Sequence, residues 1–138
     1  MRFLFDTNVV SELRNVHKTN PTVLGWARAI NSDDVSISAI TLMEIRYGAL
    51  KVRKANPELA SELARWINDD IRTRYTDRII PVDDRVALQC ADLIHPRTRP
   101  FADSLIAATA LVHDLTIVTR DIGDFEPMGV RLFNPWTA

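Results

Sequence analysis

The sequence predicts an α/β fold in which helices cover both sides of a central, mostly parallel sheet. Short apolar runs, such as residues 3–5 and 116–119, alternate along the chain with longer segments of helical periodicity. Such runs are typical of strands buried on both faces, and strands that alternate with helices favour parallel pairing. The chain has 138 residues, of which 46% are hydrophobic and 25% charged. It therefore suits one compact globular domain, and a disordered or fibrous protein is excluded.

The first half of the chain predicts two strands and four helices. Residues 3–5 form an apolar run that ends at an acid, and residues 35–38 form the second strand. Capping residues, helix-opening prolines and apolar spacing predict helices over residues 7–14, 21–30, 39–54 and 57–75. The third of these helices carries one apolar stripe, made of Ile40, Met43, Tyr47 and Leu50.

The second half of the chain predicts three strands and two helices. Residues 79–82 form a short strand at the edge of the sheet, because Pro81 cannot donate a ladder hydrogen bond. Asp83 or Asp84 caps the next helix, which ends before a proline-rich loop. The remaining elements are an alanine-rich helix, a strand, a loop and a last strand, at residues 101–113, 116–119, 120–129 and 130–133.

Charge and cysteine content narrow the possible function classes. Seventeen basic and eighteen acidic side chains give a net charge of −1, so any site for nucleic acid must be local. Cys90 is the single cysteine, which excludes an internal disulfide and fits a reducing compartment. The first residues contain no apolar stretch long enough for a signal peptide or a membrane span. We therefore expect a cytoplasmic protein without a membrane segment.

Four carboxylates fall near the expected ligand-binding edge of the sheet, which lies beyond the carboxyl ends of parallel strands. Asp6 directly follows the first strand, and Glu44 lies about two turns into the helix after the second strand. Asp103 lies in the first turn of the alanine-rich helix, and Asp121 follows the strand at residues 116–119. Helix capping is an alternative role for Asp6 and Asp103, and a turn is an alternative for Asp121. Glu44 lacks such an alternative, because a carboxylate on an apolar helix is costly unless it is paired.

Carboxylates that converge at one edge raise one another's pKa unless a cation offsets their charge. Oxygen ligands of this kind suit Mg²⁺ or Mn²⁺, ions that can activate water and stabilise a phosphodiester transition state. The three histidines are scattered along the chain, so we do not expect zinc. The residues therefore predict a magnesium or manganese site at Asp6, Glu44, Asp103 and Asp121.

Five segments of the chain carry a resemblance to a known family. They are FLFDTNVVSE at residues 3–12, SAITLMEIRYG at 38–48, DSLIAATA at 103–110, VTRD at 118–121 and FNPW at 133–136. In this order and spacing they resemble PIN-domain ribonucleases of the VapC toxin type, especially the FitB-like subgroup. The similarity covers essentially the whole chain. It implies a single PIN domain over residues 1–138, with a three-layer fold.

The resemblance also implies an activity, a site and partners. The activity is that of a metal-dependent endoribonuclease, the toxin of a type II toxin–antitoxin pair. The acids that match Asp6, Glu44, Asp103 and Asp121 form the catalytic cluster that binds Mg²⁺ or Mn²⁺, and Asp124 can share the role of Asp121. The implied partners are RNA, a small VapB-like antitoxin and a second copy of the chain in a homodimer.

Five further residues are candidates. The resemblance implies that the hydroxyl of Thr7 or Thr119 supports the cluster, and Asn8 is expected to support it too. Arg46 and Arg120 each neighbour a candidate acid, and we interpret them as contacts to phosphate, with a surface salt bridge as the alternative.

Three other functions compete with the ribonuclease. A PIN-like module could bind RNA or protein without cleavage, although the presence of all four acids argues against it. A haloacid-dehalogenase-type phosphatase needs a second Asp where this chain has Asn8, and it also needs a positioned lysine. A DNA nuclease would use the same chemistry, because the 2′-hydroxyl of RNA is sensed by the binding surface rather than by the acids.

Overall fold

Five parallel strands form the centre of the molecule. The computed structural model describes residues 1–138. Its strands are β1 (Phe3–Phe5), β2 (Val35–Ser38), β3 (Ile79–Ile80), β4 (Thr116–Val118) and β5 (Leu132–Phe133), in the order β3-β2-β1-β4-β5. All four pairs of neighbouring strands are parallel, and β3 lies at an edge, as Pro81 predicts. The predicted α/β architecture is confirmed.

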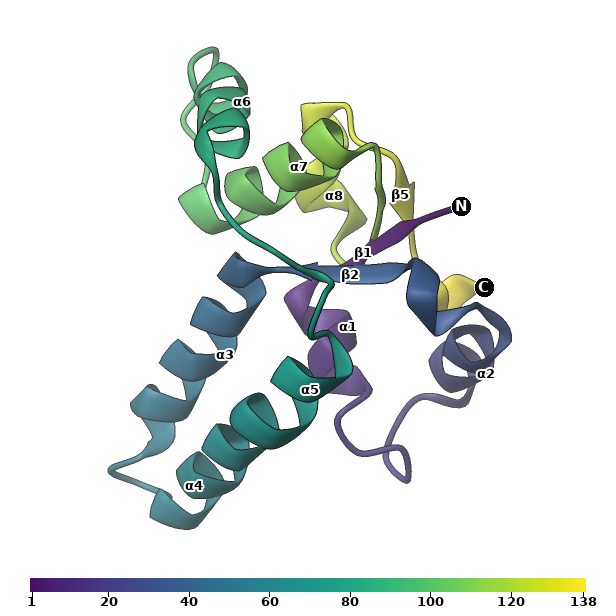
Figure 1. Cartoon of the computed structure of the whole chain (residues 1–138), viewed down its shortest axis with the longest axis vertical. Coiled ribbons are helices and arrows are strands. Elements are labelled where there is room, and N and C mark those ends of the chain that lie inside the picture. The colour runs from purple at the N-terminus through teal and green to yellow at the C-terminus, as the bar shows by residue number, and fades with distance from the viewer.

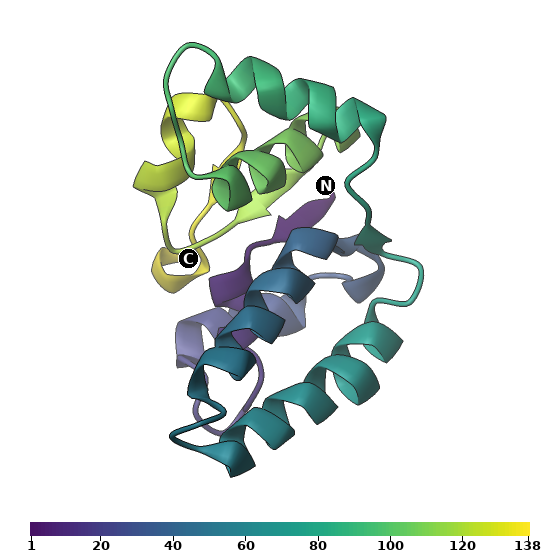
Figure 2. The same ribbon diagram turned by 90° about the vertical axis from the view of Figure 1, so that its left-hand side faces the viewer.

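Helices cover both faces of this sheet (Figure 1). One face is covered by α6 (Asp84–Ile94), α7 (Phe101–His113) and α8 (Ile122–Phe125). The opposite face is covered by α1 (Thr7–Glu12), α2 (Pro21–Ala29) and the continuous run of α4 (Pro57–Arg65), η2 (Trp66–Ile71) and α5 (Arg72–Arg74). The long helix α3 (Ala39–Val52) leaves β2 and packs beside α4, so these two helices project as an arm (Figure 2). Three short 3₁₀ helices complete the fold, namely η1 (Ser32–Asp34), η3 (Glu126–Met128) and η4 (Pro135–Thr137).

Alternating side chains of the central strands supply two separate cores. Leu4 of β1 and Ile117 of β4 face the core that α7 and α8 close. Phe5 and Val118, their neighbours in sequence, face the opposite core with α1 and η2. Successive side chains of a strand point to opposite faces, so each short strand serves both cores. This two-sided burial explains why the strands read as continuous apolar runs.

The helix predicted over residues 57–75 is interrupted by a π-helical segment. Residues Trp66–Ile71 form η2 between two α-helical stretches. The middle of this segment is Asn-Asp-Asp, and these residue types are weak helix formers because their side chains compete for backbone groups. Ile67 and Ile71, at either end of it, both remain buried in the core beneath the sheet.

The prediction of a loop over residues 120–129 is wrong in part. This segment contains α8 and η3, and Phe125 and Met128 anchor it in the core beside α7. A helix of four residues gives too little periodicity to recognise in a sequence, and tertiary burial stabilises it here.

The apolar stripe of α3 lies mostly on the surface. Met43, Tyr47 and Leu50 are exposed by 54%, 61% and 43% of their surface. The face that α3 buries instead carries Thr41, Ile45 and Ala49, which recur at intervals of four residues. None of the helices combines the length and apolar character needed to span a lipid bilayer.

Asn56 is expected to stabilise the start of α4. Its side-chain oxygen accepts a hydrogen bond from the backbone N–H of Leu59 at 3.1 Å. The substitution Asn56→Ala removes this cap and should lower the free energy of unfolding by about 1 kcal/mol in urea denaturation. Ser61→Ala, at an exposed position of the same helix, is the control and should change stability by less than about 0.5 kcal/mol. Equal stability of the two variants would contradict the capping role.

Candidate active site

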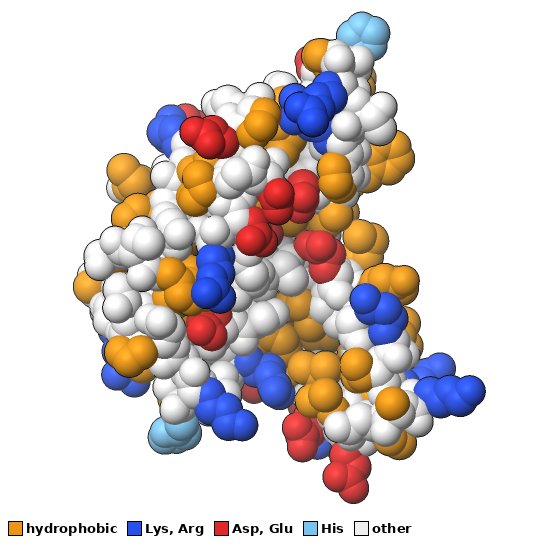
Figure 3. Space-filling view, turned by 180° about the vertical axis from the view of Figure 1, so that it is seen from behind, with side chains coloured by type: hydrophobic (Ala, Val, Ile, Leu, Met, Phe, Trp, Pro, Cys, Tyr) orange, Lys and Arg blue, Asp and Glu red, His pale blue; other side chains and the backbone are white.

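The acids predicted from the sequence lie around the carboxyl edge of the sheet. Asp6 follows β1, Glu44 lies on α3 after β2, and Asp121 follows β4. Asp103 enters from the first turn of α7. Since β1 is central, with β2 on one side and β4 on the other, this edge is where the order of the strands reverses. Figure 3 shows acidic side chains gathered near the centre of one face, beside a notch in the surface.

Asp6 is almost completely buried at this edge, with 6% of its surface exposed. Its Oδ1 accepts a hydrogen bond from the backbone N–H of Thr7 at 2.8 Å, and its Oδ2 accepts one from Thr119 Oγ1 at 2.8 Å. Burial raises the pKa of Asp6 from 3.8 to about 6; the two hydrogen bonds oppose this rise, and the charges of Glu44 and Asp103 add to it. Asp6 is also the N-cap of α1, so the capping role and the site role coexist.

Glu44 is oriented by the hydroxyl of Thr7. Thr7 Oγ1 donates a hydrogen bond to Glu44 Oε1 at 2.6 Å. Thr7 Oγ1 also lies 3.2 Å from Thr41 Oγ1. Thr41 is fully buried one turn before Glu44, and the sequence analysis missed it. Its interval of three residues from Glu44 was the available signal, because such residues share a helix face.

Asn8 connects the first acid to the last. Its Nδ2 donates to Asp121 Oδ2 at 2.9 Å, and also lies 3.3 Å from Thr119 Oγ1 and 3.4 Å from Asp6 Oδ2. Thr119 Oγ1 in turn accepts the backbone N–H of Asp121 at 3.0 Å. Asp121 stands at the N-cap of α8 without capping it, so its carboxylate is directed toward Asn8 rather than toward its own helix.

Asp103 lies among the other acids on the α7 side of the site. Burial raises its pKa most, followed by the charges of Asp124, Glu44 and Asp121. Asp103 lies in the first turn of α7, where its charge also favours the helix dipole, so this role and the site role coexist. The charges of Asp121 and of Asp124 on α8 both act on Asp103, so the structure brings both acids to the cluster. We use the name acidic cluster for Asp6, Glu44, Asp103, Asp121 and Asp124.

No basic side chain neutralises the acidic cluster, and the two salt bridges of the structure lie elsewhere. Arg46 is exposed on α3 and forms no salt bridge. The Arg120 guanidinium lies 5.1 Å from the centre of the Trp136 ring, also without a carboxylate partner. The alternative of a surface salt bridge is therefore not observed for either arginine.

The acidic cluster offers donors that suit a hard divalent cation. All of its ligating atoms are carboxylate oxygens, which is the donor type that Mg²⁺ and Mn²⁺ prefer. No three acids stand close enough to enclose an ion with the side chains as they are, and threonine and asparagine donors are hydrogen-bonded to several of the carboxylate oxygens. The raised pKa of Asp6 and Asp103 reflects negative charge that a cation would offset. In donor type and charge, the cluster fits such an ion.

Comparison with protein families matches residues 3–128 of the chain to the PIN domain. The chain belongs to the PIN domain family. Toxin FitB of Neisseria gonorrhoeae is 37% identical to this PIN domain, over 96% of the chain and 97% of the relative. VapC ribonuclease Y4jK of Sinorhizobium fredii is 31% identical, over 96% of each protein. The crystal structure of FitAcB from Neisseria gonorrhoeae superposes with a TM-score of 0.86 at 35% identity and covers 99% of both chains, so the three-layer PIN-like fold is confirmed.

Proposed function

We propose that this PIN domain is a metal-dependent endoribonuclease that acts as the toxin of a type II toxin–antitoxin pair. The observation that carries the proposal is an acidic cluster without a counter-cation at the carboxyl edge of a parallel sheet. Relatives that match nearly the whole chain support it, since one is named a toxin and another a ribonuclease.

Asp6 and Asp103 are the principal candidate ligands for Mg²⁺ or Mn²⁺, and Glu44 and Asp121 would ligate the ion or orient the attacking water. When bound, the ion supplies activation of that water and stabilisation of the charge that develops on the phosphodiester. Asp6 is fixed for this task by two hydrogen bonds of 2.8 Å, and Glu44 by one of 2.6 Å. These hydrogen bonds fix the directions of Asp6 and Glu44, and the acids must still move closer together before three of them can hold one ion.

The neighbouring residues position the acids and the substrate. Thr7, Asn8 and Thr119 are positioning residues, because each donates a hydrogen bond to a carboxylate of the cluster. Arg46 and Arg120 are proposed phosphate contacts, since both are exposed and neither is paired with an acid. Guanidinium groups suit this role, because their planar fork matches a phosphate.

The inferred partners are those of a toxin. They are an RNA substrate, a small VapB-like antitoxin that holds the nuclease inactive, and a second copy of the chain in a homodimer. A cytoplasmic location stays a prediction from the single cysteine.

Cleavage of total RNA by the purified chain, free of antitoxin, tests the proposed activity. We expect fragments with Mg²⁺ or Mn²⁺ and intact RNA with EDTA. Binding of RNA without cleavage at any concentration of either ion would instead identify a binding module. Single-stranded DNA in a parallel assay distinguishes a DNA nuclease, and a small phosphate ester distinguishes a phosphatase.

Thr119→Val is expected to weaken Mn²⁺ binding and raise the Mn²⁺ concentration needed for half-maximal cleavage by about ten-fold. Thr119 is fully buried, and its hydroxyl both donates to Asp6 and accepts from the backbone of Asp121. Valine keeps the shape of the side chain but removes these hydrogen bonds and the longer one from Asn8. Thr119→Ser restores the hydroxyl and should restore the Mn²⁺ requirement. An unchanged requirement in the valine variant would contradict the positioning role.

A further inference from the structure

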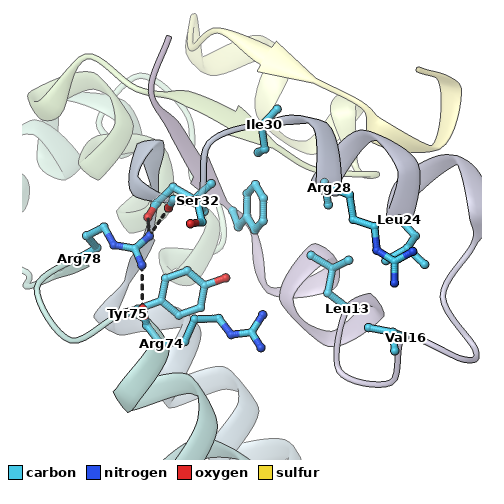
Figure 4. A pocket seen from close by; sticks show the side chains of 12 residues that line it. Leu13, Val16, Leu24, Arg28, Ile30, Ser32, Arg74, Tyr75 and Arg78 are labelled. Atoms are coloured by element: carbon cyan, nitrogen blue, oxygen red, sulfur yellow. Dashed lines mark hydrogen bonds between the residues drawn. The ribbon is translucent and has the colours of Figure 1, made fainter.

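A cavity of about 220 Å³ lies between α1, α2 and α5, and no member of the acidic cluster lines it (Figure 4). Eight of its twelve lining residues are hydrophobic. They come from both the central sheet and the helices and include Phe5, Leu13, Leu24, Ala27 and Val35. The apolar part of a ligand could therefore pack against hydrophobic side chains on several sides of the cavity.

The charged side chains that line this cavity are all basic. Arg28, Arg74 and Arg78 line it, and no aspartate or glutamate does. Arg78 is already engaged, because its guanidinium donates to the backbone oxygens of Ser32, Val35 and Arg74. It also lies 5.2 Å from the centre of the Tyr75 ring and so fixes that ring as a wall of the cavity.

Tyr75 places a polar hydroxyl in the cavity. Only 7% of its surface is exposed, and Figure 4 shows its hydroxyl pointing into the open space. The hydroxyl forms no hydrogen bond with any protein group. Burial raises the pKa of Tyr75, so at neutral pH the hydroxyl keeps its proton and is a donor. Because the hydroxyl opens into the cavity and is not engaged by the protein, it is free to donate to a ligand oxygen there.

Two exposed arginines that line the cavity are also free. The guanidinium groups of Arg28 and Arg74 take part in neither a salt bridge nor a side-chain hydrogen bond. Figure 4 shows Arg74 next to Tyr75 and Arg28 across the cavity from them. An anionic oxygen in the cavity would therefore meet the Tyr75 hydroxyl and the Arg74 guanidinium next to it.

We propose that this cavity binds a small carboxylate carried on a short apolar chain or ring. Its carboxylate accepts hydrogen bonds from Tyr75 and Arg74, and its apolar body packs on Leu13, Leu24 and Phe5. The proposal goes beyond the nuclease activity and does not depend on it, because the site shares no residue with the acidic cluster.

Titration with octanoate, followed by the amide signals of the ¹⁵N-labelled chain in NMR, tests the proposal. We expect octanoate to shift the signals of Leu24, Ala27 and Tyr75 and to leave those of α7 unchanged. 1-Octanol has the same chain without the charge and should bind about ten-fold more weakly. Equal binding of acid and alcohol, or shifts confined to other parts of the protein, would overturn the proposal. The titration needs neither RNA nor metal, so a negative result would not bear on the proposed nuclease activity.

Substitutions of the lining residues test the proposed contacts one at a time. Tyr75→Phe removes the hydroxyl alone, and Arg74→Gln removes the charge; each should weaken octanoate binding by about ten-fold. Arg72→Gln, at an exposed position outside the cavity, is the matched control and should bind as the parent chain does. Unchanged binding by Tyr75→Phe would contradict the proposed contact. Binding of an apolar peptide that ends in glutamate, with no binding of octanoate, would assign the cavity to a partner polypeptide and overturn the proposal.

Discussion

Substitution of either Asp6 or Asp103 by asparagine is expected to lower the rate of RNA cleavage by at least about a hundred-fold. Asparagine keeps the size of the side chain, but it removes the negative charge and one of the two ligating oxygens. Both residues lie in the acidic cluster, and no basic side chain forms a salt bridge with either of them. Loss of either charge should therefore weaken binding of Mg²⁺ or Mn²⁺ directly. The measurement is the initial rate of cleavage at saturating metal and at a series of lower concentrations.

Asp92→Asn is the matched control for this experiment. Asp92 is exposed on α6, outside the acidic cluster, so its substitution should leave the rate unchanged. Full activity of a folded Asp103→Asn protein would show that the acidic cluster is not the catalytic centre. Asp121→Asn and Asp124→Asn extend the series and show which of these two acids completes the cluster, since both act on the charge of Asp103.

The positions of the main acids could be predicted because they follow from topology alone. Once the strands are read as parallel, residues that come soon after a strand lie at one edge, as Asp6 does directly after β1 and Asp121 does three residues after the end of β4. The hydrogen bonds that orient these acids could not be predicted in the same way. The contact of Thr7 with Glu44 joins residues 37 positions apart, and that of Thr119 with Asp6 joins residues 113 positions apart. Such contacts depend on side-chain directions that only the packed structure fixes.

Surface and cavity features were the least predictable parts of the molecule. The apolar stripe of α3 has the periodicity of a buried helix face, yet Tyr47 is 61% exposed because Thr41, Ile45 and Ala49 occupy the buried face. The cavity beside Tyr75 is built from segments scattered from Phe5 to Arg78. No local pattern in the sequence marks residues that meet only through the chain's tertiary packing.

The raised pKa of Asp6 predicts an unusual dependence of stability on pH. In the folded chain this pKa is about 6, against 3.8 for an ordinary aspartate. The native state therefore holds the proton more tightly than the unfolded state, so stability falls as the pH rises from about 4 to about 6 and levels off above that. The rise in pKa corresponds to about 3 kcal/mol. Asp6→Asn has no group to titrate at this position. From pH 4 to pH 7, its free energy of unfolding should rise by about 2 kcal/mol relative to that of the parent chain, because part of the total effect is already present at pH 4.

Urea denaturation of both proteins at pH 4, 5, 6 and 7, in buffer that contains EDTA, measures this difference. The comparison between the two proteins cancels the titration of all other groups that the substitution leaves undisturbed. Addition of Mg²⁺ or Mn²⁺ at pH 7 should then stabilise the parent chain, by about 2.7 kcal/mol at a hundred times the dissociation constant, and stabilise Asp6→Asn much less. A difference that stays constant from pH 4 to pH 7 would show that Asp6 titrates normally. In that case burial of its carboxylate would not be the reason that the cluster favours a cation.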